Sequence, residues 1–447
     1  MTYENIKSII LVLLVCFSVL LTWSIWTYQP NYELMEKPNT IEKVAISARK
    51  EVDQIIKPDR ILYHYKDDKH LGAIDPTEID KILREIRKWN FKDFEDISTQ
   101  IRNYSNFIHN EGNAVILFPD SIPIELYKTV IDVKDSKLPN FDFDRIVIDV
   151  ENIQKEVGFV YFISMENRVA YRSRVPASFV HNFQNGTFKN AEFNSNFANY
   201  VPFKVNNELT FFLPQDESKM LRHQYYSTPL DFEKFKKALF KDPTVVQKTT
   251  FSAGVEYTNG SSLMRVYNDK NILSYINPAE MNESHFMSKN LLKRSIDFVN
   301  EHGGWTGSYR FADMNESNHS VLFRLYDDKG YPIFSEGSGI SEISETWGQS
   351  QIKQYLRSNF LLGLNINTET METVLSSGED VIEALKQMQE IEIGKLQNIV
   401  IGYSMKKDAQ TRSVYLEPSW YYQYNNQWNQ ISIDDIGGGL EYGLEQN

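Results

Sequence analysis

The longest uncharged apolar stretch of the chain lies near its amino end. Residues 9–27 contain no charged side chain, and a helix rising about 1.5 Å per residue over this length just crosses the hydrocarbon core of a bilayer. Lys7 before the stretch, and Trp23, Trp26 and Tyr28 at its end, are typical of residues that anchor a helix at the two membrane interfaces. The pattern predicts one transmembrane helix over residues 9–27.

A cleavable signal peptide is the competing interpretation of this stretch. Its apolar core would be shorter, and small residues of the A-x-A type would follow it; no such pattern follows here. We therefore expect an uncleaved anchor in the cell membrane. Lys7 and the amino terminus are positive, whereas Glu33 and Glu36 follow the helix. This bias predicts that residues 1–8 are cytoplasmic and that the large remainder is extracytoplasmic.

One stripe of side chains along the predicted helix has the spacing expected for packing against a partner helix. Its members recur every third or fourth residue, as in a left-handed helix pair, and they are Leu11, Val15, Ser18, Thr22 and Ile25. The two hydroxyl groups in the stripe could bond to a partner helix, for roughly 0.6–2 kcal/mol each. The alternative is that they bond to carbonyl oxygens of their own helix.

Four segments after the anchor have the pattern of helices. Three of them begin with a capping residue, Asp75, Thr228 or Ser377, followed three residues later by an acid. A fourth ends at His302-Gly303-Gly304, which is typical of a helix C-terminus. The expected helices run from Pro76 to about Trp89, from Pro229 to about Phe240, from about Lys289 to Glu301, and from Gly378 to about Met388.

Most of the remaining apolar segments have the pattern of β-hairpins. Runs of β-branched and aromatic residues flank short turns rich in Asn, Asp and Gly. The expected strand pairs include 160–164 with 168–175, 263–267 with 272–276, 321–326 with 331–334, and 415–424 with 428–433; residues 61–65 begin another. The fold class that follows is α+β: one N-terminal transmembrane helix, then a multi-domain exported body of mostly antiparallel sheets with few helices.

Two stretches of the exported part share one order of elements. A helix, a strand and a hairpin occur around residues 229–276 and again around residues 378–433, which predicts related middle and C-terminal domains. We expect an extracytoplasmic N-terminal α+β domain over 28–155, a middle domain over 156–290, a C-terminal domain over 291–436, and a flexible tail over 437–447.

Composition narrows the classes of function. The 447 residues carry a net charge of −13, so the acidic body is a poor candidate for binding nucleic acid, whose phosphates demand Lys and Arg. Hydrophobic residues make up 41% of the chain, enough for real cores. The single cysteine, Cys16, lies in the predicted membrane helix, so thiol catalysis and disulfides are excluded from the body.

The sequence contains no recognised catalytic motif. The histidines are scattered, and none forms a ligand pair at metal spacing. His302-Gly303-Gly304 is explained as a helix end, and Asp142, Asp144 and Asp149 near Arg145 as charges on an exposed strand. We therefore expect a protein that is not an enzyme and has no catalytic residue, metal or cofactor. The alternative is a membrane-anchored cell-wall glycan or ester hydrolase that uses some of these carboxylates.

Several segments of this chain resemble proteins of the YycH family. The segments Glu4 to Ile10 and Leu21 to Glu33, on both sides of the apolar core, are similar to the family's opening, and Ile56 to Ile61 and Leu416 to Tyr421 are similar to later family segments. The resemblance covers the whole length of the chain.

The resemblance implies an accessory regulator of a two-component system. Proteins of this family modulate the WalK (YycG) sensor histidine kinase of low-GC Gram-positive bacteria, which with its response regulator WalR controls cell-wall metabolism. They act together with YycI, a single-pass protein whose exported part is similar to the last two domains of the family. The expected partners are thus YycI, WalK and membrane lipid through one helix, with association between the membrane helices. The family supplies no catalytic residue.

Overall fold

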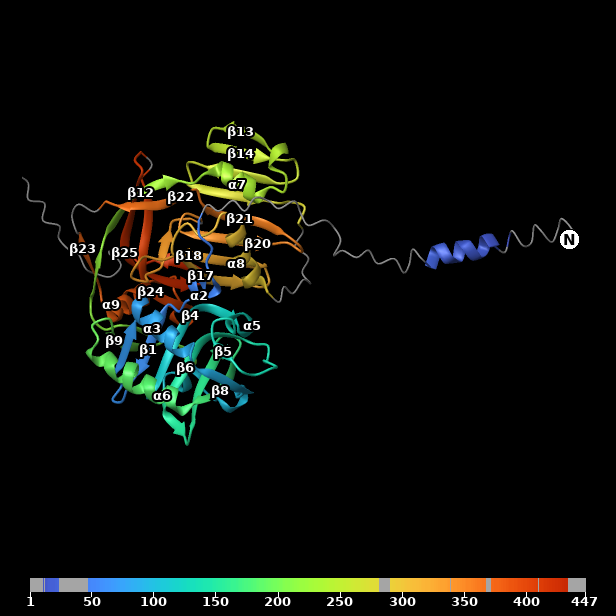
Figure 1. Ribbon diagram of the computed structural model, residues 1–447. Helices are drawn as coiled ribbons and strands as arrows, with labels where there is room; N and C mark the ends of the chain where they lie inside the picture. The colour runs from blue at the N-terminus through green and yellow to red at the C-terminus, as the bar shows by residue number, and fades with distance from the viewer. Residues whose placement is uncertain are drawn as a thin grey trace, which may run out of the picture. The chain divides into compact units, whose positions relative to one another are not determined.

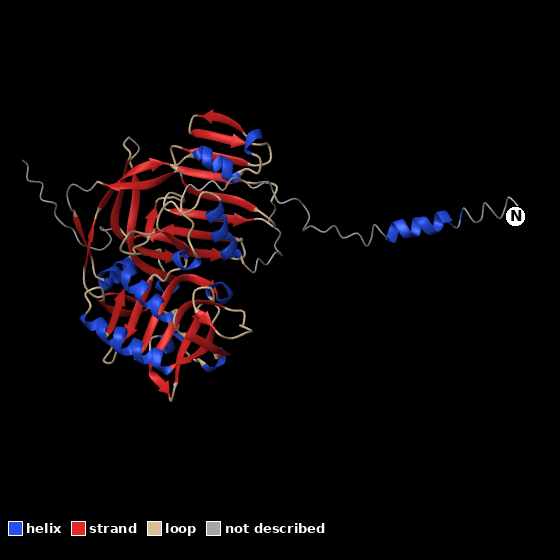
Figure 2. Ribbon diagram, viewed as in Figure 1, coloured by secondary structure: helices blue, strands red, loops and turns tan. Residues whose placement is uncertain are grey.

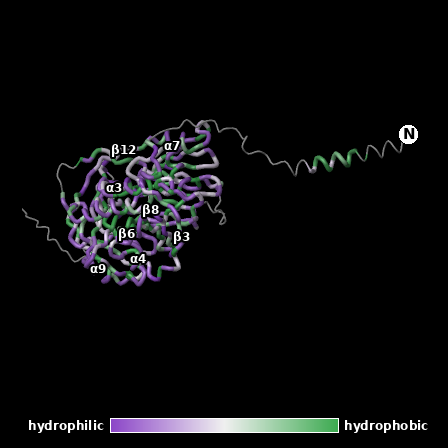
Figure 3. Tube along the Cα trace, turned by 60° about the horizontal axis from the view of Figure 1, so that its bottom comes forward, coloured by the Kyte–Doolittle hydropathy of each residue, from purple (hydrophilic) through white to green (hydrophobic). Residues whose placement is uncertain are grey.

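The structure is a computed structural model that describes residues 11, 13–23, 47–280, 290–337, 339–366, 371–408 and 410–432. Contacts divide the chain into two units, Met1–Lys43 and Val44–Asn447; the second is the body. In the first unit, residues 13–23 are helical, exposed and hydrophobic (Figure 3). Among the described residues, no helix is both long enough and apolar enough to cross a membrane. The anchor predicted over 9–27 lies partly outside the described residues.

The body consists mainly of antiparallel sheets, as Figure 2 shows. This confirms the expected predominance of antiparallel sheet. The largest sheet, called the first sheet, has ten strands, in the order β10 (Thr210–Pro214), β9 (Ala198–Lys204), β2 (His70–Ala73), β1 (Arg60–His64), β4 (Asn113–Pro123), β6 (Asp142–Gln154), β7 (Val157–Ser164), β8 (Val169–Pro176), β3 (Asn90–Asp96) and β5 (Asp132–Val133). Its pairs are antiparallel except β3 with β5.

Two further large sheets follow along the chain. The eight-stranded sheet has the order β13 (Gln247–Phe251), β14 (Gly254–Thr258), β15 (Leu263–Tyr267), β16 (Ile272–Ile276), β21 (Ile352–Ser358), β20 (Glu342–Trp347), β18 (Ser320–Leu325) and β17 (Tyr309–Asn315). The six-stranded sheet contains β19 (Ile333–Ser335), β24 (Leu396–Lys407), β25 (Ser413–Tyr424), β12 (His223–Pro229) and β22 (Phe360–Asn365), with β26 (Gln427–Gln430) on β25. A separate ribbon pairs β11 (Ser218–Leu221) with β23 (Glu372–Leu375).

The sheets do not divide where the sequence predicted domain limits. Residue 155 lies in the turn between β6 and β7, and Gln154 pairs with Val157 across it. The limit at residue 290 falls between strands of the eight-stranded sheet, because β16 before it pairs with β21 after it. Hydrogen-bonded strands therefore join segments that the sequence assigned to different domains.

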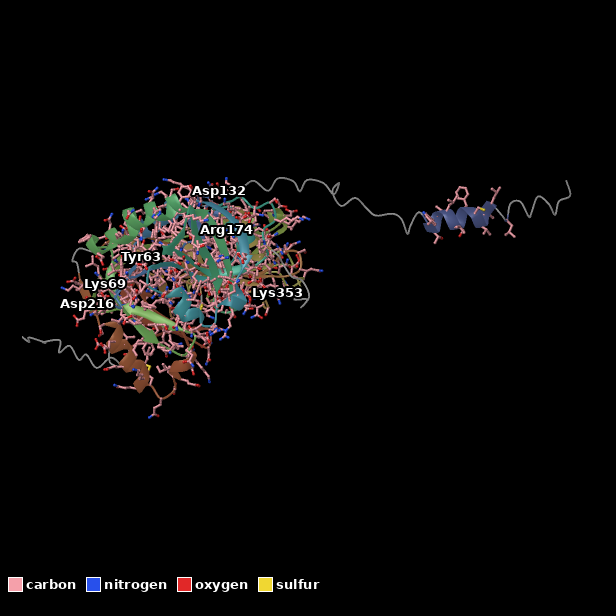
Figure 4. The ribbon with its side chains drawn as sticks, turned by 90° about the horizontal axis from the view of Figure 1, so that it is seen from below. Tyr63, Lys69, Asp132, Arg174, Asp216 and Lys353 are labelled. Atoms are coloured by element: carbon pink, nitrogen blue, oxygen red, sulfur yellow. The ribbon has the colours of Figure 1, made fainter. Side chains whose placement is uncertain are left out.

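Both faces of the first sheet are buried. On one face, Ile61, Tyr63 and Ile116 pack with α3 (Pro76–Ile86) and α6 (Ala177–Phe183) in the main core (Figure 1). The ring of Tyr63, labelled in Figure 4, meets that of Phe183 edge-on at 6.1 Å. On the other face, alternate residues such as Leu62 and Val115 form a second cluster with α4 (Tyr104–Ile108). Because successive side chains of a strand point to opposite faces of the sheet, the strands contribute to two hydrophobic cores.

The helix ends show which side chains act as caps. Asp75 caps α3, and Ser377 caps α9 (Gly378–Gln387) in a capping box with Asp380, as expected. The helix α8 (Leu291–Glu301) ends at His302, and Gly303 and Gly304 follow with positive φ. The other short helices are α2 (Val52–Ile55) and α5 (Ile124–Tyr127).

The expected cap at Thr228 is wrong. Thr228 and Pro229 end strand β12, where they pair with Leu361 and Phe360. The helix α7 (Phe232–Leu239) begins one turn later, and Asp231 accepts hydrogen bonds from the amides of Glu233 and Lys234.

Four of the expected hairpins form and one does not. The pairs β1–β2, β7–β8, β15–β16 and β25–β26 are antiparallel hairpins. In contrast, β18 pairs with β17 and β20, and β19 leaves it to pair in parallel with β24. A single bridge, Tyr326 with Pro332, remains of the expected 321–334 hairpin; proline offers no N–H to extend it.

The segment 47–55, which links the first unit to the first sheet, packs against a different part of the body. The amide of Lys50 donates to the side-chain oxygen of Asn300, and the amide group of Asn300 donates back to the carbonyl of Lys50, both at 2.9 Å. The Lys50 ammonium donates to the carbonyl of Gly307 at 2.8 Å. The helix α2 contacts α8 and β17. This linking segment is therefore held by the eight-stranded sheet.

The two candidate caps of α7 give a direct test of this fold. Replacing Asp231 by alanine removes the acceptor for two helix N–H groups, and we expect a loss of about 1 kcal/mol in the free energy of unfolding. The matched change Thr228→Ala, at an exposed strand position, should cost less than half as much. Chemical unfolding of both variants measures the difference; equal losses would contradict the assigned helix start.

Candidate functional site

A polar cleft of about 690 Å³ lies where the three large sheets meet. It is lined from the first sheet by β1, β4, β6 and β10, from the eight-stranded sheet by β17 and β18, and from the six-stranded sheet by β24, β25 and β26. We call it the central cleft. Its carboxylates are Asp59, Asp120, Asp144, Glu166, Glu208 and Asp313, and its cations are Arg60, Arg145, Arg168, Arg324 and Lys395. A volume of this size is within the range of small-molecule sites.

Asp120 joins the first sheet to β17. One of its carboxylate oxygens accepts from the amide of Ser121, and the other accepts from the amide of Met314, both at 2.7 Å. Burial and then the neighbouring charge of Asp313 raise the pKa of Asp120 to about 7. Burial also raises the pKa of Asp313. The two carboxyl groups therefore carry less than two full negative charges near neutral pH.

Asp59 forms a second link between the same sheets. The hydroxyl of Tyr326 donates to the Asp59 carboxylate at 2.8 Å. Burial raises the pKa of Asp59, and the hydrogen bond from Tyr326 and the charge of Arg310 act in the opposite direction. Arg310 itself lies over the ring of Tyr326, 4.5 Å from its centroid. The carboxyl group is thus enclosed by donors from another sheet.

Arg324 is held in an aromatic cage at the cleft. Its guanidinium lies 4.5 Å from the ring centroid of Phe334 and 5.7 Å from that of Trp428, and one terminal nitrogen donates to Glu342 at 2.7 Å. The residue is 5% exposed, and its Nε atom is buried without a hydrogen-bond partner. Such an atom carries a desolvation cost that a bound acceptor would relieve.

The carboxylates that the sequence marked take different positions. Asp144 lines the central cleft, bonds to Nε of Arg145 at 2.7 Å and accepts from the amide of Met165 at 3.1 Å. Asp149 accepts from the amides of Glu151 and Asn152 near the end of β6, and Asp142, at the start of β6, does not line the cleft. Thus Asp144 lies with the acids of the cleft, and Asp142 lies near the charge of Glu316. All three aspartates are half-buried, so the expectation of an exposed strand face is wrong.

His302 and its glycines have the structural role that the sequence suggested. The imidazole stacks on Phe298 at 4.0 Å, and its Nδ1 lies 2.9 Å from the Phe298 carbonyl oxygen. The amide of Gly304 donates to the carbonyl of Val299. These contacts close the end of α8.

Three histidines expected to be scattered lie together in the second core. Nδ1 of His64 is 2.9 Å from Nδ1 of His70, and Nε2 of His64 is 3.0 Å from Nδ1 of His109. Phe212 packs against all three rings. Burial lowers the pKa of His64 to about 3, so the imidazole stays neutral. Within the described part of the chain, no group of three or more potential ligand side chains is placed to hold a metal ion.

Part of the predicted membrane-helix site lies in the described helix of the first unit. Leu11, Val15, Ser18 and Thr22 are exposed there, as is the anchor Trp23. The Thr22 hydroxyl donates to the carbonyl of Ser18 at 2.8 Å, which is the intrahelical alternative for this side chain. Ile25, Lys7, Trp26 and Tyr28 lie outside the described residues, so the stripe and the anchors stay predictions.

The sequence could not have located the acids of the cleft. Asp120 and Met314 are 194 residues apart and meet only through sheet packing. Asp313 lies at a register shift between β17 and β18, and no local pattern marks it. The one available hint was Asp144, whose neighbour Arg145 suggested a charge pair.

Comparison with known proteins shows one family throughout the chain. Residues 4–195 match the family model described as YycH protein, N-terminal domain, and residues 208–435 match YycH protein, C-terminal domain. A curated relative in Bacillus subtilis (strain 168), the "Two-component system WalR/WalK regulatory protein YycH", is 25% identical over 451 residues, which cover 97% of each chain. The crystal structure of YycH from Bacillus subtilis has the same fold, with a TM-score of 0.73 at 22% identity over 87% of this chain and 99% of that one.

The coupling of Asp120 to Asp313 predicts a pH-dependent stability. Asp120, whose pKa rises from 3.8 to about 7 on folding, makes the protein less stable as the pH rises between these values. The reason is that the folded state keeps the proton up to a higher pH than the unfolded state does. Asp313→Asn removes the neighbouring charge and lowers the pKa of Asp120. We expect this variant to be more stable than the native protein by about 1 kcal/mol at pH 8 and by little at pH 5.

Chemical unfolding at the two pH values measures the effect. The matched control is Asp216→Asn, which removes an exposed aspartate between β10 and β11 and should leave the pH profile unchanged. A gain of equal size at pH 5 and pH 8 would contradict the coupling.

Proposed function

The chain belongs to the YycH family, and we propose on this premise that it regulates a WalR/WalK two-component system. The observation that supports this function is the alignment with the regulatory protein of Bacillus subtilis over nearly the whole of both chains. The same architecture in the solved relative supports an equivalent body. The role would be that of a regulator of cell-wall metabolism rather than of an enzyme.

The proposed arrangement places the protein in the cell membrane by one helix. Residues 1–8 are cytoplasmic, residues 9–27 cross the lipid, and the body is extracytoplasmic. The apolar, exposed side chains of residues 13–23 support an anchor, because an apolar helix surface of this kind calls for a lipid or protein partner. The kinase WalK (YycG) and the single-pass protein YycI are the proposed partners, with the membrane helices in contact.

To regulate the kinase, the protein must bind its two signalling states with different affinities. A partner that bound both signalling states of the kinase equally would shift neither. A nearly complete reversal of the two populations needs about 10⁴-fold tighter binding to one state. A stripe of five helix positions can supply part of that difference through close packing. Contacts between the body and extracytoplasmic partners would supply the rest.

The linking segment is docked on the body at its start. The paired hydrogen bonds between Lys50 and Asn300, with the docking of α2 on α8, fix the start of the body to the eight-stranded sheet. A change within the body that moves α8 would therefore also move residues 47–55.

A membrane-anchored cell-wall glycan or ester hydrolase remains the second candidate. The observation in its favour is that Asp144, Asp120 and Asp313 share the central cleft, since glycan hydrolysis uses two carboxyl groups. Two observations weigh against it. Both oxygens of Asp120 accept backbone N–H bonds, and Asp144 is bonded to Arg145, so neither side chain is arranged to deliver a proton to a leaving group.

Incubation of purified cell wall with the full-length protein separates the two candidates. The hydrolase predicts release of soluble glycan or ester products, which Asp144→Asn would abolish. The proposed regulator predicts no release above a buffer blank.

Exchange of the membrane helix tests the proposed regulation. Replacing residues 9–27 by an unrelated apolar helix of equal length should abolish the effect on WalK, while the body stays in the membrane fraction. The readout is the phosphorylation of WalR in cells that carry the chimera in place of the native protein. Normal regulation by the chimera would refute the helix-contact mechanism.

A matched pair of point changes tests the stripe itself. Ser18→Leu alters the stripe, and Val19→Leu adds the same side chain one position away, on another helix face. We expect the first change to reduce regulation at least as much as loss of one interhelical bond, roughly threefold for 0.6 kcal/mol, and the second to leave it intact. A larger loss of regulation from Val19→Leu than from Ser18→Leu would place the contact on the helix face that carries Val19.

A further inference from the structure

Arg324 in the central cleft has bonding capacity that the protein does not use. The residue is 5% exposed, and its Nε is buried without a partner, although Glu342 pairs with another nitrogen of the same guanidinium. Phe334 and Trp428 hold the guanidinium from its faces. A buried donor that is fixed but unpaired at the wall of a cleft is the arrangement expected of a ligand site.

The rim beside this cage is rich in side-chain amides. Nε2 of Gln397 donates to the side-chain oxygen of Asn426 at 2.5 Å, and the backbone amide of Asn426 donates to the side-chain oxygen of Gln397 at 2.7 Å. These two bonds use one of the four side-chain N–H groups of the pair. Asn398 and Gln423 line the same part of the cleft. The rim thus presents both donors and acceptors next to the ring of Trp428.

The charge of the cleft favours a neutral ligand. Six carboxyl groups face five cationic side chains, and burial raises the pKa of Asp59, Asp120 and Asp313. The net charge of the lining is therefore close to zero at neutral pH. Strongly charged ligands gain little there, and an apolar ligand would leave the many polar groups without partners.

We propose that the central cleft binds a neutral saccharide without cleaving it. Hydroxyl groups donate and accept at once, which matches a lining of carboxylates, guanidinium groups and amides. The ring of Trp428 offers an aromatic face on which the apolar side of a sugar ring can pack. This inference goes beyond the proposed regulatory role and does not depend on it.

Binding in the cleft would connect three sheets. Trp428 and Gln397 belong to the six-stranded sheet, Arg324 to the eight-stranded sheet, and Asp144 to the first. A ligand that touches all three stabilises their relative placement by mass action, because it binds only the assembled cleft. Saturation should therefore raise the melting temperature of the full-length protein.

The test uses the full-length protein in detergent and three uncharged or zwitterionic probes of similar size. Chitotriose is a neutral saccharide with acetamido groups, maltotriose is a neutral saccharide without them, and trialanine is a peptide. Calorimetric titration measures the affinity for each probe, and a thermal melt measures stabilisation. We expect chitotriose, maltotriose or both to bind, and trialanine not to bind.

Matched variants assign the binding to the cleft. Trp428→Ala, which removes the aromatic face, should weaken saccharide binding about tenfold, and the exposed-rim change Gln397→Ala should also weaken it. Gln427→Ala, next to Trp428 but outside the cleft, and Tyr226→Ala, an aromatic residue 51% exposed on β12, serve as controls that should bind as the native protein does. Because Gln397 is exposed, its variant keeps the test valid should Trp428→Ala fail to fold.

The results that overturn the proposal are distinct from those that concern regulation. Absence of binding to either saccharide, binding of trialanine alone, or equal weakening by the control variants each refutes it. Cleavage of chitotriose, followed as new reducing ends, also refutes it, since the cleft would then be catalytic. Failure of the helix exchange to affect WalK leaves the result of the titrations unchanged, so the two ideas can fail separately.

Discussion

Two half-buried carboxyl groups at the first sheet, Asp59 and Asp120, accept hydrogen bonds from the segment that forms the edge of the eight-stranded sheet. The Tyr326 hydroxyl serves one and the Met314 amide the other. Leaving such a group without its donor costs about 1–3 kcal/mol, so neither sheet can move away without leaving polar groups unsatisfied. The sheets are thereby fixed in register, and the space left at their junction is the central cleft. The same bonds that join the sheets thus border a polar cavity.

This junction has consequences at both ends of the chain. The linking segment is bonded to Asn300 of α8 and to Gly307, which precedes β17, and β17 carries Met314 at the cleft. The rim residues Gln397 and Trp428 belong to the C-terminal strands. Strand β17 thus lies between the linking segment and the central cleft.

Local sequence patterns predicted the features that local interactions determine. The caps at Asp75 and Ser377, the end of α8 at Gly303 and Gly304, and the tight hairpins each depend on residues close in sequence. The features that the sequence did not predict depend on pairing between segments far apart in the chain. Thr228 has the chemistry of a cap, but pairing with Leu361 extends strand β12 through it. The expected domain limits, the histidine cluster and the pairing of Asp120 with Met314 all depend on contacts between segments far apart in the chain, and no periodicity encodes these.

Two perturbed groups near the cleft, His64 and Asp120, titrate in opposite directions. His64 has a pKa lowered from 6.5 to about 3 by burial, so its contribution to stability is lost as the pH falls through this range. Asp120 has a pKa raised from 3.8 to about 7, so its contribution is lost as the pH rises. Between about pH 4 and pH 6.5 the two slopes have opposite signs, and His109, whose pKa burial also lowers, adds to the slope of His64. Both groups are neutral in that interval because burial disfavours the charged form of each. As the pH rises toward 7, the Asp120 contribution is lost at the cleft itself, where the carboxyl group must ionise beside Asp313.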